Sequence, residues 1–252
     1  MENKMILYHG SKYIIEKPTL YGGNKTNDYG YGFYCSKEIE LAKEWACPDK
    51  ADGYANEYLL DLGGLKVLDL TDKKYNILNW LAILLQFRIP SNMSMNDKQV
   101  KDYILENFMV DISDVDVIIG YRADDSYFTF ARDFVRNIIT IRQLSSAMEL
   151  GRLGIQIVLH SNKAFNQLTY IKSHLANGDD YYLKRSIRDL NAKKDYIDVV
   201  RNKINMDYDT YYEIITNYKK IAKLLNKNKL NEYIVNFKDP KIVDRIKREV
   251  LN

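Results

Sequence analysis

Residues 28–45 read DYGYGFYCSKEIELAKEW, and the order of elements within this stretch decides how the rest of the chain is interpreted. Gly30 and Gly32 flank a tyrosine in a turn, where glycine takes positive φ at little steric cost. Residues 33–35 are aromatic and small apolar, which favours a short β-strand. From Ser36, a residue type that often caps helices, apolar residues recur at helical spacing. The stretch therefore predicts a glycine turn, a strand and a helix.

Two aromatic side chains stand out in this arrangement, Tyr34 on the strand and Trp45 on the helix. They can act as walls for a planar ligand, although each alone is explained as readily by a place in the hydrophobic core. A second motif, the sequence Tyr8-His9-Gly10-Ser11, ends a short apolar strand over residues 5–9. The combination of the two motifs favours a binding site over two unrelated core aromatics.

Together the motifs resemble the NAD-binding half of the ADP-ribosyltransferases of the diphtheria-toxin and poly(ADP-ribose) polymerase class. In that class a histidine at the end of the first strand hydrogen-bonds the adenosine ribose, and two aromatic residues enclose the nicotinamide. The matching residues here are His9, Tyr34 and Trp45, with tryptophan where the class usually has tyrosine. The chain is also similar to a bacterial group of ADP-ribosyltransferase-like proteins known as a domain of unknown function. The specific resemblance covers about the first 50 residues and extends more weakly to Ser161.

The resemblance implies an α+β fold, with an ADP-ribosyltransferase-like split β-sheet core. We expect two small packed sheets that enclose a cleft, and helices inserted between the early and late strands. The residue patterns agree with helices inserted between strands, because β-type alternation and helical periodicity each occur in several separate segments. Strands are predicted over 54–62, 66–70, 115–121 and 155–159, and helices over 76–87, 97–109, 127–137 and 140–150. The segment 155–159 is expected to be the last strand.

The C-terminal third differs from the rest of the chain in pattern and in charge. Regular β signals end near residue 170, and helical patterns follow over 183–200, 209–225 and 240–251. Residues 171–252 hold 18 Lys and Arg against 12 Asp and Glu. We therefore expect an NAD-binding domain over 1–170 and a basic, all-helical C-terminal region over 171–252. A solvated helical surface explains this charge most simply, and a surface for nucleic acid or an acidic partner is the alternative.

The resemblance implies that NAD is a co-substrate and assigns its binding residues. Breaking the nicotinamide–ribose bond passes through a cationic, oxocarbenium-like transition state, as in glycoside cleavage. Stacking aromatics suit the grip on nicotinamide, and each pair contributes about 1 kcal/mol beyond area burial. The residues expected to bind NAD are His9, Gly10, Ser11, Gly32, Phe33, Tyr34 and Trp45. Tyr34 is also counted among the catalytic candidates.

The catalytic position departs from the family pattern. The class carries a glutamate at the start of a late strand, and the matching residue here is Gln156. A glutamine can hydrogen-bond a ribose but cannot act as a general base, whose loss costs about 10²–10⁴-fold in rate. Glu149 is the nearest carboxylate and the second candidate, in a helical pattern. Asp125, with Asp124, follows a strand and either receives the acceptor's proton or caps the next helix.

We expect a mono-ADP-ribosyltransferase, a glycosyltransferase that moves ADP-ribose from NAD to a macromolecule and releases nicotinamide. Protein is favoured over nucleic acid as the target. Two alternatives stay open, a transferase that acts on nucleic acid and a catalytically degenerate module that binds NAD or a partner. A bacterial toxin, a defence protein and a delivered effector would all carry such a sequence. An antitoxin or another partner protein fits the first of these settings.

Other classes have little support in the sequence. Its composition, 46% hydrophobic and 28% charged, is that of a globular protein. The chain lacks an 18-residue apolar run and a signal peptide's apolar segment. Its two cysteines lack metal-ligand spacing, and there is no phosphate-binding Gly-x-x-x-x-Gly-Lys and no Gly-x-Ser-x-Gly. We expect a cytoplasmic protein, in its own cell or delivered into another, with no membrane partner and no metal.

Overall fold

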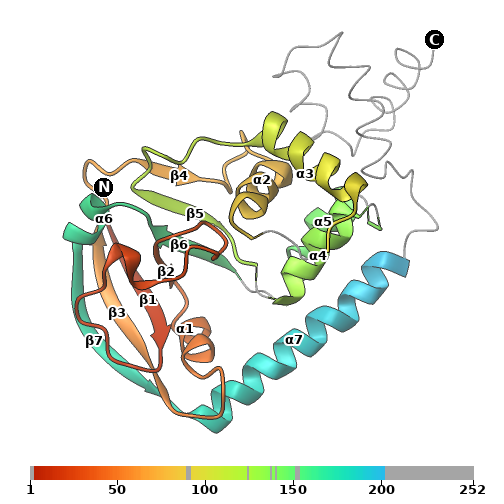
Figure 1. The fold of residues 1–252 in the computed structure, drawn as a ribbon. Coiled ribbons are helices and arrows are strands. Elements are labelled where there is room, and N and C mark those ends of the chain that lie inside the picture. The colour runs from red at the N-terminus through yellow and green to blue at the C-terminus, as the bar shows by residue number, and fades with distance from the viewer. Residues whose placement is uncertain are drawn as a thin grey trace, which may run out of the picture.

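Seven strands form one mixed β-sheet (Figure 1). Their order across the sheet is β4-β5-β6-β2-β1-β3-β7, and every neighbouring pair is antiparallel except β4 and β5. The strands are β1 (Lys4–Ser11), β2 (Phe33–Ser36), β3 (Gly53–Asp61), β4 (Val67–Asp69), β5 (Val117–Tyr121), β6 (Ile155–Leu159) and β7 (Leu168–Ala176). The segments predicted as strands from the sequence are all strands in the structure, with ends shifted by one or two residues.

The structure is a computed structural model. It describes residues 3–201 apart from 89–91, 124, 137, 140 and 151–153. The helices predicted over 209–225 and 240–251 lie outside the described residues, as does most of the basic tail. None of the helices in the described ranges is long and apolar enough to cross a membrane.

The pairing between neighbouring strands is shortest between β1 and β2. These strands share a single pair of facing residues, Tyr8 with Ser36, whereas β1 faces β3 over eight positions and β2 faces β6 over four. We expected two separate sheets, and the structure joins both halves at this one pair. The molecule is therefore an α+β protein with one seven-stranded sheet whose two halves, β4-β5-β6-β2 and β1-β3-β7, meet at a short junction.

Helices are inserted where the periodicity predicted them. They are α1 (Ile39–Ala46), α2 (Ile77–Phe87), α3 (Met95–Phe108), α4 (Asp125–Val135), α5 (Ile141–Ala147), α6 (Asn162–Asn166) and α7 (Gly178–Arg201), with a 3₁₀ turn at Leu20–Gly22. Helices α2 and α3 lie between β4 and β5 in the chain, and α4 and α5 lie between β5 and β6. Residues 77–85 of α2 are all buried, so this helix is the centre of the larger hydrophobic core.

The start of α1 differs from the prediction. Ser36 is the last residue of β2 rather than the cap of the helix, which begins at Ile39. The Ser36 hydroxyl is buried and accepts a hydrogen bond from the Glu38 amide at 3.0 Å, so it stabilises the connection between strand and helix. The cap position itself is Glu38, whose side chain makes no capping bond.

The expectation that strands end at Leu159 is wrong. Strand β7 pairs with β3 at eight positions and extends to Ala176, so the boundary expected at residue 170 falls inside a strand. As an edge strand it leaves much of its length exposed, and its apolar residues therefore do not form a clear alternating run. Helix α7 follows at Gly178, packs against α1 and runs on towards α4 and α5 (Figure 1).

Gly10 allows β1 and α1 to approach each other closely. A Cβ atom at Gly10 would lie 2.0 Å from the Ala42 carbonyl oxygen and 2.8 Å from the Ala46 amide nitrogen, both in the backbone of α1. A backbone atom cannot move aside as the end of a side chain can. The need for glycine here therefore comes from strand–helix packing, a reason other than the ligand contact expected from the sequence.

We predict that Gly10→Ala lowers the free energy of unfolding by about 1–3 kcal/mol, because the added methyl group overpacks the contact with α1. Urea denaturation measures the change. The control is Gly63→Ala, whose Cβ would meet only the Asp61 side chain, at 3.1 Å, and should cost much less. Equal stability of the two variants would show that β1 and α1 are not so closely packed.

Candidate functional site

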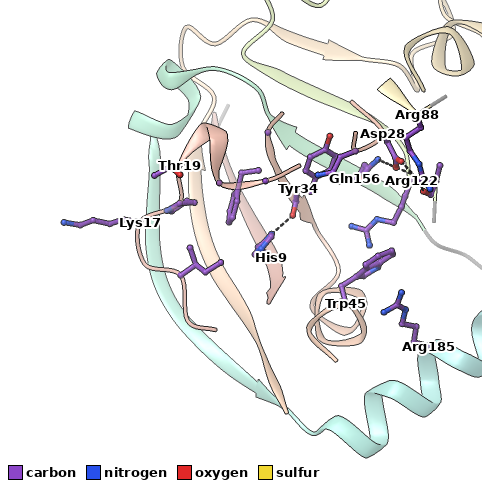
Figure 2. A pocket seen from close by; sticks show the side chains of 18 residues that line it. His9, Lys17, Thr19, Asp28, Tyr34, Trp45, Arg88, Arg122, Gln156 and Arg185 are labelled. Atoms are coloured by element: carbon purple, nitrogen blue, oxygen red, sulfur yellow. Dashed lines mark hydrogen bonds and ion pairs between the residues drawn. The ribbon is translucent and has the colours of Figure 1, made fainter. Parts of the chain in front are cut away.

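A cavity of about 500 Å³ lies beside the β1–β2 junction (Figure 2). Its walls come from β1, β2, α1, β6, α7, the residue after α2, the chain after β5 and the long connection between β1 and β2. Six residues singled out from the sequence line it, namely His9, Gly32, Phe33, Tyr34, Trp45 and Gln156. The fold thus brings together residues that are up to 147 positions apart in the chain.

Three other candidates, Gly10, Ser11 and Glu149, are not among the described residues that line the cavity. Gly10 packs against α1, and the Ser11 hydroxyl accepts a hydrogen bond from the Tyr13 amide at 3.1 Å. Glu149 is exposed in the turn after α5. Asp125 is the first residue of α4, and its side chain lies outside the described part of the structure, as does the whole of Asp124.

The ring of His9 is held in a fixed position and tautomer. Its Nδ1 lies 2.7 Å from the carbonyl oxygen of Tyr34, and its plane stacks on the Phe33 ring with centroids 4.2 Å apart. Burial lowers the pKa of His9 to about 4, although the hydrogen bond to the carbonyl opposes the shift. The ring is therefore neutral at pH 7. Because a carbonyl only accepts, Nδ1 carries the hydrogen and Nε2 remains an acceptor.

The hydroxyl of Tyr34 is tied to the glycine turn predicted from the sequence. It donates to the Gly30 carbonyl oxygen at 2.7 Å and accepts from the Tyr29 amide at 3.0 Å. Gly30 has φ 75°, and a Cβ there would lie 2.6 Å from the Phe87 ring, so the turn requires glycine. Burial raises the pKa of Tyr34 well above its usual value. The residue therefore offers a fixed aromatic surface to the cavity, and its hydroxyl is used within the protein.

Asp28 is the one carboxylate among the described residues that line the cavity. It is 7% exposed and accepts hydrogen bonds from Arg88 Nη1 at 2.9 Å, the Ala123 amide at 2.8 Å and Gln156 Nε2 at 3.0 Å. Gln156 Nε2 also donates to the Tyr121 carbonyl oxygen at 3.1 Å. Both amide hydrogens of Gln156 are thus directed at protein acceptors, which gives this residue a clear structural role.

Four basic side chains also line the cavity, and sequence reasoning assigned none of them. They are Lys17, Arg88, Arg122 and Arg185. Arg88 pairs with Asp28, while Arg122 and Arg185 place their guanidinium carbons 4.5 and 4.8 Å from the centre of the Trp45 ring. Figure 2 shows these two arginines on opposite sides of the tryptophan. Trp45 is therefore packed between two cations.

Little in the sequence could have pointed to these cations. Arg122 follows a predicted strand, which is a common place for functional side chains. Arg185 lies in an ordinary lysine- and arginine-rich helical pattern, and only the packing of α7 brings it to the cavity. Together with His9 and Tyr34, the cations make a cavity suited to a ligand that carries both aromatic groups and negative charge.

The fold and cavity define an α+β protein with a cavity lined by basic and aromatic side chains, beside the short pairing of β1 and β2. The chain belongs to the DUF3990 family of proteins of unknown function, whose family model matches residues 5–170. No curated protein and no solved structure matches it. The matched range runs from the second residue of β1 into the start of β7 and ends before α7, so Arg185 lies outside it.

We predict that Gln156→Glu destabilises the protein more at pH 8 than at pH 5. The new carboxylate would replace the donor that lies 3.0 Å from Asp28, and two adjacent carboxylates raise the pKa of one of them. The folded variant then binds more protons than the unfolded chain, so its stability falls as pH rises.

Gln156→Met is the matched control, because it removes the same hydrogen bonds without adding charge. It should cost about 1–3 kcal/mol at both pH values. Urea denaturation of both variants and the wild type at the two pH values measures the difference. If Gln156→Glu loses the same stability at pH 5 and pH 8, the contact with Asp28 is absent.

Proposed function

We propose that this protein is a mono-ADP-ribosyltransferase that transfers ADP-ribose from NAD to a macromolecule, with protein favoured as the acceptor. The observation that carries the proposal is the meeting of His9, Tyr34 and a set of basic side chains in one cavity. The residues that resemble the family's donor site, His9, Tyr34 and Trp45, come from three separate elements, β1, β2 and α1. Their convergence supports a common ligand.

The cavity suits each part of NAD. The Nε2 atom of neutral His9 can accept a hydrogen bond from a ribose hydroxyl. The fixed ring of Tyr34 can stack on a planar group, and the basic side chains can neutralise the two phosphates. Asp28, the one carboxylate that the described residues contribute to the lining, is already paired with Arg88, so it does not oppose an anionic ligand.

Bound NAD would supply the ADP-ribosyl group, and nicotinamide leaves as a neutral molecule with the electron pair of its bond to ribose. The protein's part is to hold the donor and fix its orientation. The acceptor's nucleophilic atom forms the new bond and loses its proton. Asp28 already accepts three hydrogen bonds, so we assign it no role as the base. Glu149 and Asp125 stay candidates for receiving that proton.

A catalytically degenerate NAD-binding module is the second candidate function. The observation that favours it is the position of Gln156, which is 2% exposed and uses both amide hydrogens within the protein. Such a residue is a weak substitute for a catalytic glutamate. The module and the enzyme share the donor site and differ in whether nicotinamide is released.

We predict that Tyr34→Ala weakens NAD binding about 10-fold or more, because the stacking surface is lost. Tyr34→Phe keeps the ring and removes the hydroxyl bonded to Gly30, so its affinity should stay within about 3-fold of the wild type. Isothermal titration calorimetry measures both variants, and circular dichroism checks that each is folded. Equal affinity of wild type and Tyr34→Ala would remove Tyr34 from the donor site.

Nicotinamide release separates the two candidate functions. The protein is incubated with NAD and a cell lysate, nicotinamide is measured by chromatography, and modified molecules are identified by mass spectrometry. Release together with ADP-ribosylated protein supports the transferase. Binding of NAD without release or transfer supports the degenerate module, and absence of binding rejects both.

A further inference from the structure

The packing of Trp45 between Arg122 and Arg185 concentrates positive charge at one end of the cavity. The two guanidinium groups lie within 5 Å of the same indole ring and approach it from opposite sides (Figure 2). An aromatic face holds a guanidinium group flat without neutralising it. The arrangement thus fixes two cations next to a cavity that also contains His9 and Tyr34.

Helix α7 is anchored in a way that places Arg185 in this position. The anchors are ion pairs and hydrogen bonds to α1, the helix that carries Trp45. Arg188 makes two contacts to Glu44, at 2.8 and 2.5 Å, and Lys184 and Tyr181 each contact Glu40 at 3.1 Å. Glu44 is only 4% exposed, so its pair with Arg188 is shielded from water. Arg185 therefore lies on a braced segment of the helix.

Arg185 differs from its charged neighbours on α7 in its ion pairs. Lys184 and Arg188 are paired with carboxylates of α1. Arg185 makes no ion pair with any residue in the described part of the chain, and its side chain is half-buried against Trp45 and the cavity. A guanidinium group in such a site can bind an anion, and its planar donors match two phosphate oxygens.

We propose that Arg122 and Arg185, held by Trp45, form a phosphate-binding subsite for a nucleotide ligand. Arg185 comes from a helix beyond the range matched by the family model, so this chain supplies part of the subsite from its C-terminal region. In this arrangement Trp45 is a positioning residue for the two arginines. If the phosphate belongs to NAD, the inference rests on the proposed function. A nucleic-acid acceptor carries phosphates of the same chemistry and is the other source that the test distinguishes.

The test compares ligands with and without phosphate. Calorimetry measures the affinities of ADP-ribose, adenosine and a short single-stranded DNA for the full-length protein and for Arg185→Gln. We expect Arg185→Gln to bind ADP-ribose about 10-fold more weakly and adenosine as the wild type does, because a charge-assisted contact to phosphate is lost. Arg185→Lys keeps the charge without the planar donors and should give an intermediate loss. The control is Lys194→Gln, an exposed charge on the same helix, which should change neither affinity.

The pattern of losses identifies the source of the phosphate. A loss for ADP-ribose assigns the subsite to the dinucleotide, and a loss for DNA alone assigns it to a nucleic-acid acceptor. The inference is overturned if Arg185→Gln binds all three ligands as the wild type does, or if adenosine and ADP-ribose lose affinity equally. If the subsite binds ADP-ribose but no nicotinamide is released from NAD, the inference stands and the transferase proposal fails.

Trp45 variants test the positioning role separately. Trp45→Ala should weaken ADP-ribose binding and leave adenosine binding unchanged, because the arginines lose their common support. Trp45→Phe retains an aromatic face and should restore most of the affinity. Unchanged ADP-ribose binding by a folded Trp45→Ala variant would contradict this role, and an equal loss for adenosine would instead place Trp45 in direct contact with the nucleoside.

Discussion

The short junction between β1 and β2 is the constraint on which the cavity depends. Because the two strands face each other at only one pair of residues, the Tyr34 carbonyl accepts its hydrogen bond from the His9 ring. This bond joins the two halves of the sheet and sets the tautomer of the histidine. One interaction therefore connects the architecture of the sheet to the chemistry of the site.

Two further supports hold the walls of the cavity. The buried carboxylate of Asp28 collects donors from Arg88, Ala123 and Gln156, which ties the glycine turn to the ends of β5 and β6. At another wall, ion pairs between α1 and α7 hold Arg185 against Trp45. Burying a polar network is favourable only when its members are satisfied, and here the bonds also fix the positions of the lining side chains.

The sequence predicted the elements better than it predicted their contacts. The motifs around His9 and Tyr34 are local, and their signals predicted the strands that carry both residues. That the two side chains share a cavity was expected from the combination of the motifs, and both line it. Strand β7 was missed because an edge strand carries a weak apolar pattern. The contact of Gln156 with Asp28 and the contact of Arg185 with Trp45 each join residues more than 100 positions apart in the chain. No local sequence pattern encodes such tertiary contacts.

Nuclear magnetic resonance of the histidine rings tests the central claim most directly, because the chain has three histidines in different surroundings. His9 lines the cavity at the junction, whereas His174 lies on β7 and contacts Glu57. With the signals assigned from single substitutions, NAD is added at pH 7. The proposed site predicts a saturable shift of the His9 signal with little change at His174. An unchanged His9 signal at saturating NAD would contradict it.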